Sequence, residues 1–128
     1  MVTATGSAAI SYAVKNIAVA GDHIVASSQI YGGTYNLFAN TLREQGSSTT
    51  FVDPFDPDNF EKAIRPSTKL LYAETLCNPN SDVIDLNTIA DIAHRNGITF
   101  IVDNTFATPY LLRPIEHGAD SIRVSMAR

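Results

Sequence analysis

The sequence has a single cysteine, no tryptophan and few basic residues. Because only Cys77 is present, the chain can form neither an internal disulfide nor a cysteine-rich metal site. Its three histidines lie too far apart in the sequence to suggest a metal-ligand motif, and no metal is expected. The nine Lys and Arg residues are scattered, and the net charge of −4 argues against a nucleic-acid or anionic-membrane partner.

Long hydrophobic runs are also missing. The longest, near residues 17–20, is far too short to cross a bilayer, and the first six residues carry no basic segment of the kind that begins a signal peptide. Together with the single cysteine, these features predict a cytoplasmic location. What is present is a hydrophobic content of 45% in 128 residues, enough for one ordinary domain with a real core.

The most informative stretch is residues 98–105, an apolar run that ends in Asp103. Its β-branched and aromatic residues, which follow Gly97, predict a strand buried on both faces. In an open parallel sheet the carboxyl end of a strand faces the ligand crevice, so Asp103 could meet a cation there, with Thr105 on the same side. On these residues alone, a local turn in which Asp103 bonds its own backbone is the better interpretation.

Segments typical of strands and helices alternate along the whole chain. This alternation predicts an α/β fold, a mostly parallel sheet with helices on both faces and right-handed crossovers. No Gly-x-Gly-x-x-Gly follows a strand and no P-loop occurs. Strands are predicted at residues 23–27, 49–53, 69–74 and 98–103, with a last one within 118–125, and helices at 8–20, 35–45, from a cap at Asp56 and from a cap at Asp85.

Two further groups of residues could bind a ligand. Thr5, Gly6 and Ser7 stand at a helix start, whose unpaired N–H groups could seat a phosphate, although by themselves they fit an ordinary N-cap better. Tyr31 precedes a predicted glycine loop and could either stack on a flat heteroaromatic or close the edge of the core. A parallel sheet could bring these groups together with Asp103.

Six motifs carry a resemblance that extends from residue 4 to about residue 120. Together they are similar to the pyridoxal-phosphate enzymes of cysteine and methionine metabolism, and residues 35–38 and 51–53 most resemble the O-acetylhomoserine sulfhydrylase branch. The motifs are 5–10 (Thr-Gly-Ser-Ala-Ala-Ile), 21–24 (Gly-Asp-His-Ile), 31–35 (Tyr-Gly-Gly-Thr-Tyr), 74–79 (Glu-Thr-Leu-Cys-Asn-Pro), 102–110 (Val-Asp-Asn-Thr-Phe-Ala-Thr-Pro-Tyr) and 113–120 (Arg-Pro-Ile-Glu-His-Gly-Ala-Asp).

The resemblance implies the central part of the large domain of a fold-type I enzyme and a role for each matching residue. The implied cofactor is pyridoxal 5'-phosphate (PLP), whose protonated ring acts as an electron sink for a bound amino acid. The implied roles are phosphate binding by Thr5, Gly6, Ser7 and Ser125, stacking on the ring by Tyr31, pairing with the ring nitrogen by Asp103, contact near the ring hydroxyl by Asn78, lining of the site by Thr105 and a place in the surrounding shell for Glu74.

The last residues depart from the family pattern. The family's Schiff-base lysine ends a His-Ser-x-Thr-Lys segment, whereas residues 124–128 are Val-Ser-Met-Ala-Arg, with Arg128 at the position of the lysine and Ala127 in place of a hydroxyl residue. A guanidinium stays protonated and cannot form an imine, and none of the three lysines matches this position. We therefore expect no catalytic residue here and interpret residues 1–128 as an incomplete PLP-binding domain without the N-terminal segment, the lysine and the C-terminal domain.

For the parent enzyme, the resemblance implies γ-replacement on O-acetylhomoserine by sulfide or a thiol, giving homocysteine or methionine, with this chain inactive alone. Alternatives are a cystathionine γ-synthase or methionine γ-lyase as parent, a non-catalytic PLP-binding remnant, or a truncated gene product. The expected partners are a small amino-acid substrate and further copies of the chain. A sheet separated from its partner domain and subunit should expose apolar surface, so we expect a homo-oligomer or a poorly soluble monomer. No nucleic-acid or membrane partner is expected.

Overall fold

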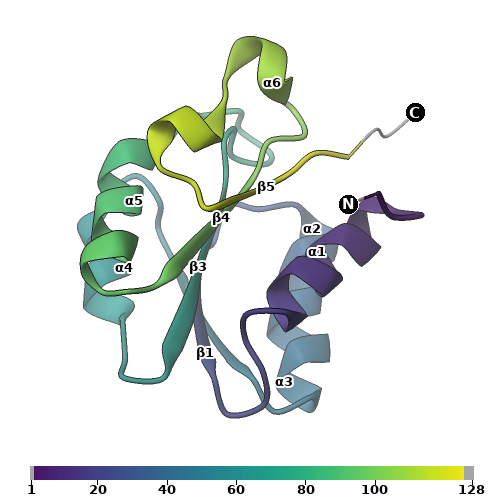
Figure 1. Ribbon diagram of the computed structural model, residues 1–128, viewed down its shortest axis with the longest axis vertical. Coiled ribbons are helices and arrows are strands. Elements are labelled where there is room, and N and C mark those ends of the chain that lie inside the picture. The colour runs from purple at the N-terminus through teal and green to yellow at the C-terminus, as the bar shows by residue number, and fades with distance from the viewer. Residues whose placement is uncertain (1, 126–128) are drawn as a thin grey trace.

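The computed structural model describes residues 2–125, which form one sheet of five parallel strands with helices on both faces (Figure 1). The strand order is β2-β1-β3-β4-β5, so the chain builds outward from β1 to one edge and then to the other. The predicted α/β fold is confirmed. The strands are β1 (His23–Ser27), β2 (Ser48–Val52), β3 (Thr68–Glu74), β4 (Thr99–Asp103) and β5 (Ser121–Arg123).

The helices divide between the two faces of the sheet as an alternating α/β chain requires (Figure 1). One face is covered by α1 (Gly6–Lys15), α2 (Gly32–Asn36), the π-helical turn η1 (Leu37–Thr41) and α3 (Leu42–Glu44). The other face is covered by α4 (Asp58–Ala63) and α5 (Leu86–Arg95), while α6 (Thr108–Leu111) and the 3-10 turn η2 (Pro114–His117) lie between β4 and β5 in the chain.

The core consists of two apolar layers, one on each face of the sheet. Successive residues of a strand point to opposite faces, so the buried central strands supply both layers. The layer under α4 and α5 includes Phe60, Leu71, Ile92 and Phe100, and the layer under α1 to α3 includes Val14, Phe38, Tyr72 and Ile101.

Side-chain capping was predicted at the start of two helices and explains one of them, α5. Asp85 caps α5 as predicted, because its Oδ1 accepts the N–H of Thr88 at 3.1 Å. The predicted cap at Asp56 lies one residue too early, because α4 begins at Asp58 with Pro57 as its N-cap. The Asp56 carboxylate accepts the N–H of Asp58 at 3.1 Å in the turn before the helix.

Two predicted helix boundaries were wrong. The first helix ends at Lys15, and the residues that follow turn, with the Asp22 carboxylate accepting the N–H of Val19 at 2.9 Å. The predicted glycine loop is the first turn of α2, with Tyr31 as its N-cap. A Cβ on Gly33 would lie 2.6 Å from Cε1 of Tyr31, so the glycine leaves room for the ring to fold over the helix start.

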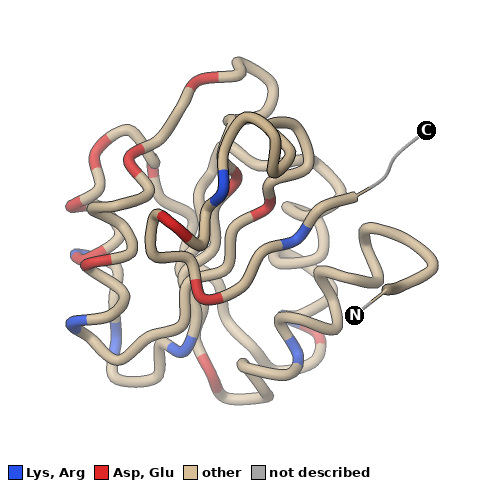
Figure 2. The backbone as a smooth tube through the Cα atoms, turned by 45° about the horizontal axis from the view of Figure 1, so that its top comes forward, with Lys and Arg blue, Asp and Glu red and all other residues tan. Residues whose placement is uncertain are grey.

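Acidic and basic positions are interspersed along the described chain (Figure 2). Residues 2–125 contain no group of three His, Cys, Asp or Glu side chains arranged to hold a metal ion. Within the same range, no helix has the length and apolar character needed to span a membrane.

Candidate functional site

Three neighbouring strands each end in a charged residue at the same level of the sheet. Glu74 of β3 lies opposite Asp103 of β4, and Asp103 lies opposite Arg123 of β5. Since residues in register on neighbouring strands point to the same face, these side chains gather on one side of the carboxyl edge. Ligands of parallel α/β sheets bind at this edge, so it is the candidate site.

Asp103 is the centre of this cluster and is only 4% exposed. Its Oδ1 accepts the N–H of Thr105 at 3.0 Å and the Thr105 hydroxyl at 2.5 Å. Its Oδ2 forms an ion pair with Nη1 of Arg123. The carboxylate therefore makes the local turn expected from its sequence context and also meets a cation, which comes from its own chain.

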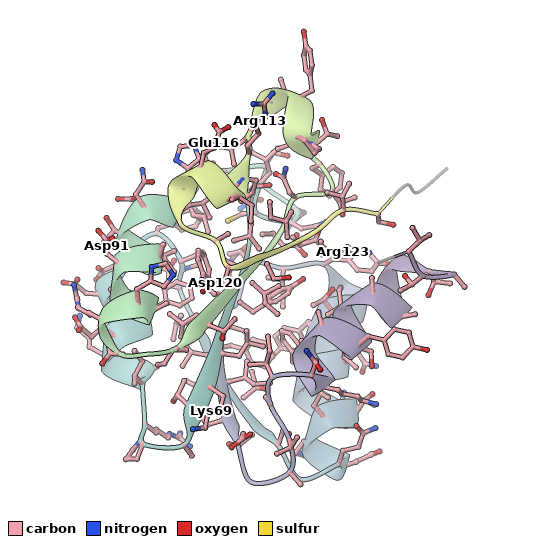
Figure 3. The ribbon with its side chains drawn as sticks, viewed as in Figure 1. Lys69, Asp91, Arg113, Glu116, Asp120 and Arg123 are labelled. Atoms are coloured by element: carbon pink, nitrogen blue, oxygen red, sulfur yellow. The ribbon has the colours of Figure 1, made fainter. Side chains whose placement is uncertain are left out.

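The Arg123 guanidinium reaches from β5 toward the start of α1 (Figure 3). Its side chain is 13% exposed, and Nη1 also donates to Oγ1 of Thr105 at 3.2 Å. A Cβ on Gly6 would collide with Nη2 of Arg123, so the glycine at the start of α1 permits this approach. The buried Nε of Arg123 has no hydrogen-bond partner among residues 2–125.

Glu74 is the second buried carboxylate, also 4% exposed. Burial raises the pKa of Glu74 to about 7, with a smaller contribution from the negative charge of Asp103. The backbone N–H of Tyr31 donates to Oε1 of Glu74 at 2.8 Å and, like the charge of Arg123, opposes this rise. Glu74 can therefore hold a proton near neutral pH while it fixes the backbone at Tyr31.

Two adjoining hollows meet at Arg123 and Ser125. The first, here called the Asp103 cavity, has a volume of about 180 Å³, and its lining includes Tyr31, Glu74, Asp103, Thr105, Arg123 and Ser125. The second, here called the α1 groove, has a volume of about 450 Å³, and its lining includes Thr5, Gly6, Ala9, Arg123 and Ser125.

The structure brings four of the predicted site residues into the Asp103 cavity: Tyr31, Asp103, Thr105 and Ser125. The backbone N–H of Ser125 donates to Oγ1 of Thr105 at 3.0 Å. The cavity thus joins two of the three groups that the sequence was expected to bring together, those of Tyr31 and Asp103, but not the group at Thr5 to Ser7.

The remaining predicted residues lie apart from this cavity. Thr5 and Gly6 line the α1 groove, and the Thr5 hydroxyl accepts the N–H of Ala8 at 3.1 Å, as an ordinary N-cap does. Ser7 and Asn78 are not among the residues lining either hollow, and the backbone N–H of Asn78 donates to the Gln29 carbonyl at 3.4 Å. Ala127 and Arg128, on which the missing-lysine prediction rests, lie outside the described residues.

Sequence reasoning missed Arg123. The signal was present, because residues 121–123 form a third short strand that ends in a charge, as the strands ending in Glu74 and Asp103 do. Using that signal requires the strand order, which the sequence alone did not supply.

Comparison with known proteins places this chain in a family. The family model for Cys/Met metabolism PLP-dependent enzymes matches residues 1–128. An O-acetyl-L-homoserine sulfhydrylase from Corynebacterium glutamicum is 46% identical over 125 residues, which are 97% of this chain and 29% of that protein. An L-methionine gamma-lyase from Porphyromonas gingivalis is 45% identical over 92% of this chain and 30% of that protein. The chain thus spans about 30% of the length of these relatives.

A solved structure shares the fold. The crystal structure of a putative O-acetylhomoserine (thiol)-lyase from Campylobacter jejuni, which contains a pyridoxyl-lysine monophosphate, matches 95% of this chain and 30% of its own with a TM-score of 0.93 and 43% identity. Because the family model covers every residue and the fold agrees, the chain belongs to the Cys/Met metabolism PLP-dependent enzymes, whose cofactor is pyridoxal 5'-phosphate.

Proposed function

We propose that this chain is the cofactor-holding part of an enzyme that replaces the γ-substituent of O-acetylhomoserine with sulfide or a thiol, forming homocysteine or methionine. Two O-acetyl-L-homoserine sulfhydrylases, at 46% and 44% identity, support this reaction. The observation that carries the proposal is the buried Asp103 carboxylate, which shares a cavity with Tyr31 at the carboxyl edge of the sheet.

The residues of the site suit PLP with one exception. Asp103 offers a buried carboxylate of the kind that pairs with a protonated ring nitrogen, and Tyr31 offers an aromatic ring in the same cavity. The α1 groove, which adjoins this cavity at Ser125, begins at a helix N-terminus suited to a phosphate. The exception is Arg123, whose guanidinium holds Oδ2 of Asp103.

Each of these residues has a definite task in the proposed site. When bound, PLP supplies the electron sink for chemistry at the amino-acid substrate. Asp103 would keep a proton on the ring nitrogen, and Tyr31 would orient the ring. Glu74 fixes the backbone of Tyr31 through the 2.8 Å hydrogen bond and, with a pKa of about 7, can retain a proton at neutral pH.

We infer that the chain alone does not catalyse this reaction, because none of its lysines lines the Asp103 cavity or the α1 groove, where one would have to form the Schiff base with PLP. The test is incubation of the purified chain with PLP, O-acetylhomoserine and sulfide, with homocysteine measured by mass spectrometry. We expect no homocysteine above a reaction without protein. Formation at the rate of a full-length relative would contradict the inference.

Cofactor holding is tested separately by calorimetric titration with pyridoxamine 5'-phosphate, which has no aldehyde and cannot form imines with lysines. We expect reversible binding that weakens in Asp103→Asn and Tyr31→Ala. Because Arg123 occupies Asp103 in the wild type, the Arg123→Met protein is titrated as well; absence of binding by both folded proteins would overturn the proposed function.

A lyase parent is the second candidate, favoured by the L-methionine gamma-lyase from Porphyromonas gingivalis at 45% identity and the cystathionine gamma-lyase from Bacillus subtilis at 46%. The discriminating measurement is the product set of the full-length gene product. Homocysteine from O-acetylhomoserine and sulfide would support the synthase, whereas methanethiol from methionine would support the lyase.

We also propose that the chain resides in the cytoplasm, as its single cysteine suggests.

We further propose that the chain self-associates. Tyr110 and Leu111 of α6 are 93% and 71% exposed, an unusual exposure for large apolar side chains on neighbouring residues. Light scattering after size exclusion should give a mass above 13.8 kDa. A monomeric mass would refute self-association.

A further inference from the structure

We propose that Arg123 is a resident cation in the cofactor site of this chain, and that its guanidinium must leave Asp103 before the PLP ring nitrogen can pair there. This inference rests on the proposed function, because it concerns the same carboxylate. It adds a residue that opposes cofactor binding.

The contacts of Asp103 are the first support. Oδ1 accepts two hydrogen bonds from Thr105, and Oδ2 is held by Nη1 of Arg123. Both oxygens are therefore engaged within the chain. A ring N–H aimed at this carboxylate would compete with Arg123, because Thr105 is part of the same turn as Asp103 and Arg123 comes from another strand.

The register of the sheet places the two competing charged residues next to each other. Arg123 lies directly opposite Asp103 on the neighbouring strand, so the two side chains point to the same face. Opposite charges at such positions attract, and the low exposure of both side chains, 13% and 4%, limits screening by solvent. The pair therefore forms without any ligand.

The position of the guanidinium is the second support. Arg123 lines both the Asp103 cavity and the α1 groove, and it reaches from Asp103 to Gly6. A ring at Asp103 with its phosphate at the start of α1 would have to cross this space. The guanidinium thus separates the two halves of the site.

Arg123 is also free enough to move. It ends β5, a strand of three residues at the edge of the sheet, which pairs only with β4. Its Nε lacks a hydrogen-bond partner among residues 2–125, so the guanidinium leaves one of its donors unsatisfied while it is paired with Asp103.

The test is the affinity for pyridoxamine 5'-phosphate in the wild type and in Arg123→Met, which removes the cation and keeps a long side chain. We expect binding about tenfold tighter in Arg123→Met. This is the factor that results if Asp103 is free to pair with the ring in about a tenth of the wild-type molecules. The control is Arg113→Met, which removes an arginine 68% exposed and paired with Glu116, and should leave the affinity unchanged.

Because Arg123→Met leaves Asp103 without its counter-ion and could fail to fold, two measurements avoid that loss. Arg123→Gln keeps an amide donor for Asp103 and should also bind more tightly than the wild type. In the ¹⁵N-labelled wild type, saturation with pyridoxamine 5'-phosphate should shift the guanidinium signals of Arg123 and leave those of Arg113 in place. Unchanged Arg123 signals at saturation would overturn the proposal.

The failures of the two proposals can be distinguished. Equal affinities of wild type and Arg123→Met, both weakened by Asp103→Asn, would overturn the role of Arg123 and leave the proposed function standing. If neither folded protein binds pyridoxamine 5'-phosphate, the proposed function fails and the role of Arg123 fails with it. Inorganic phosphate serves as a second probe, and we expect its affinity to change less than that of pyridoxamine 5'-phosphate, since it does not need Asp103.

Discussion

Glu74→Gln should stabilise the protein at neutral and alkaline pH. The folded protein holds the pKa of Glu74 at about 7 against an ordinary value of 4.5, mainly because the carboxyl is buried. As the pH rises between these values, the unfolded chain releases its proton while the folded chain retains it, so the free energy of unfolding falls. At about 1.4 kcal/mol per pH unit, the loss amounts to about 3 kcal/mol above pH 7.

Glutamine removes this loss without removing the hydrogen bond. Its amide oxygen can accept the N–H of Tyr31, which now donates to Oε1 of Glu74 at 2.8 Å, and it carries no charge at any pH. Glu74→Gln should therefore equal the wild type at about pH 4.5 and exceed it by about 3 kcal/mol at about pH 8. The opposite effect of His23, whose pKa is lowered by burial, occurs in both proteins and cancels in the difference.

The assay is urea unfolding followed by circular dichroism at several pH values between these two. Glu116→Gln is the matched control, because Glu116 is 64% exposed and should alter the stability by less than about 1 kcal/mol. A constant difference between Glu74→Gln and the wild type across the pH range would refute a raised pKa at Glu74.

Four further substitutions test backbone conformation and core packing by the same unfolding assay. Gly118→Ala should cost about 1–3 kcal/mol and more than Gly97→Ala, because Gly118 has φ +87° and a Cβ there would also lie 2.6 Å from Cβ of Ala90. Gly97→Ala, with φ +67° and open space, should cost only about 1 kcal/mol, and equal costs would contradict the steric argument. Leu71→Ala should cost about 2–5 kcal/mol in the buried layer, and a smaller loss would show that the layer collapses around the cavity. Tyr72→Phe should change stability by less than about 1 kcal/mol, because the buried hydroxyl has no hydrogen-bond partner among residues 2–125, and a larger loss would reveal a partner.

Local sequence patterns predicted much of the fold. β1 occupies residues 23–27 as predicted, and α5 follows the Asp85 cap, because both signals lie within a few residues of the element that they specify. The order of the elements then restricts the sheet to parallel crossovers. The start of α2 at Gly32 was not predicted, because two consecutive glycines are typical of a loop and the sequence does not show that the ring of Tyr31 lies against Gly33.

In the candidate site, too, contacts between residues near in sequence could be predicted, whereas contacts between distant residues could not. Asp103 and Thr105 are two residues apart, and their contact follows from local geometry. The pairing of Asp103 with Arg123 joins two residues that are 20 positions apart in the sequence, and it depends on β5 lying next to β4. The approach of Arg123 to Gly6 requires the whole sheet to be assembled, so no spacing in the sequence indicates it.

The central claim is that Asp103 is positioned to hold the cofactor by its ring nitrogen. The most direct test compares pyridoxamine 5'-phosphate with an analogue whose ring nitrogen is replaced by carbon, in the Arg123→Met protein with and without Asp103→Asn. We predict that Asp103→Asn weakens binding of the natural ring about tenfold or more, as expected for a charged hydrogen bond, and leaves the carbon analogue unchanged. Equal effects on both ligands would contradict the claim.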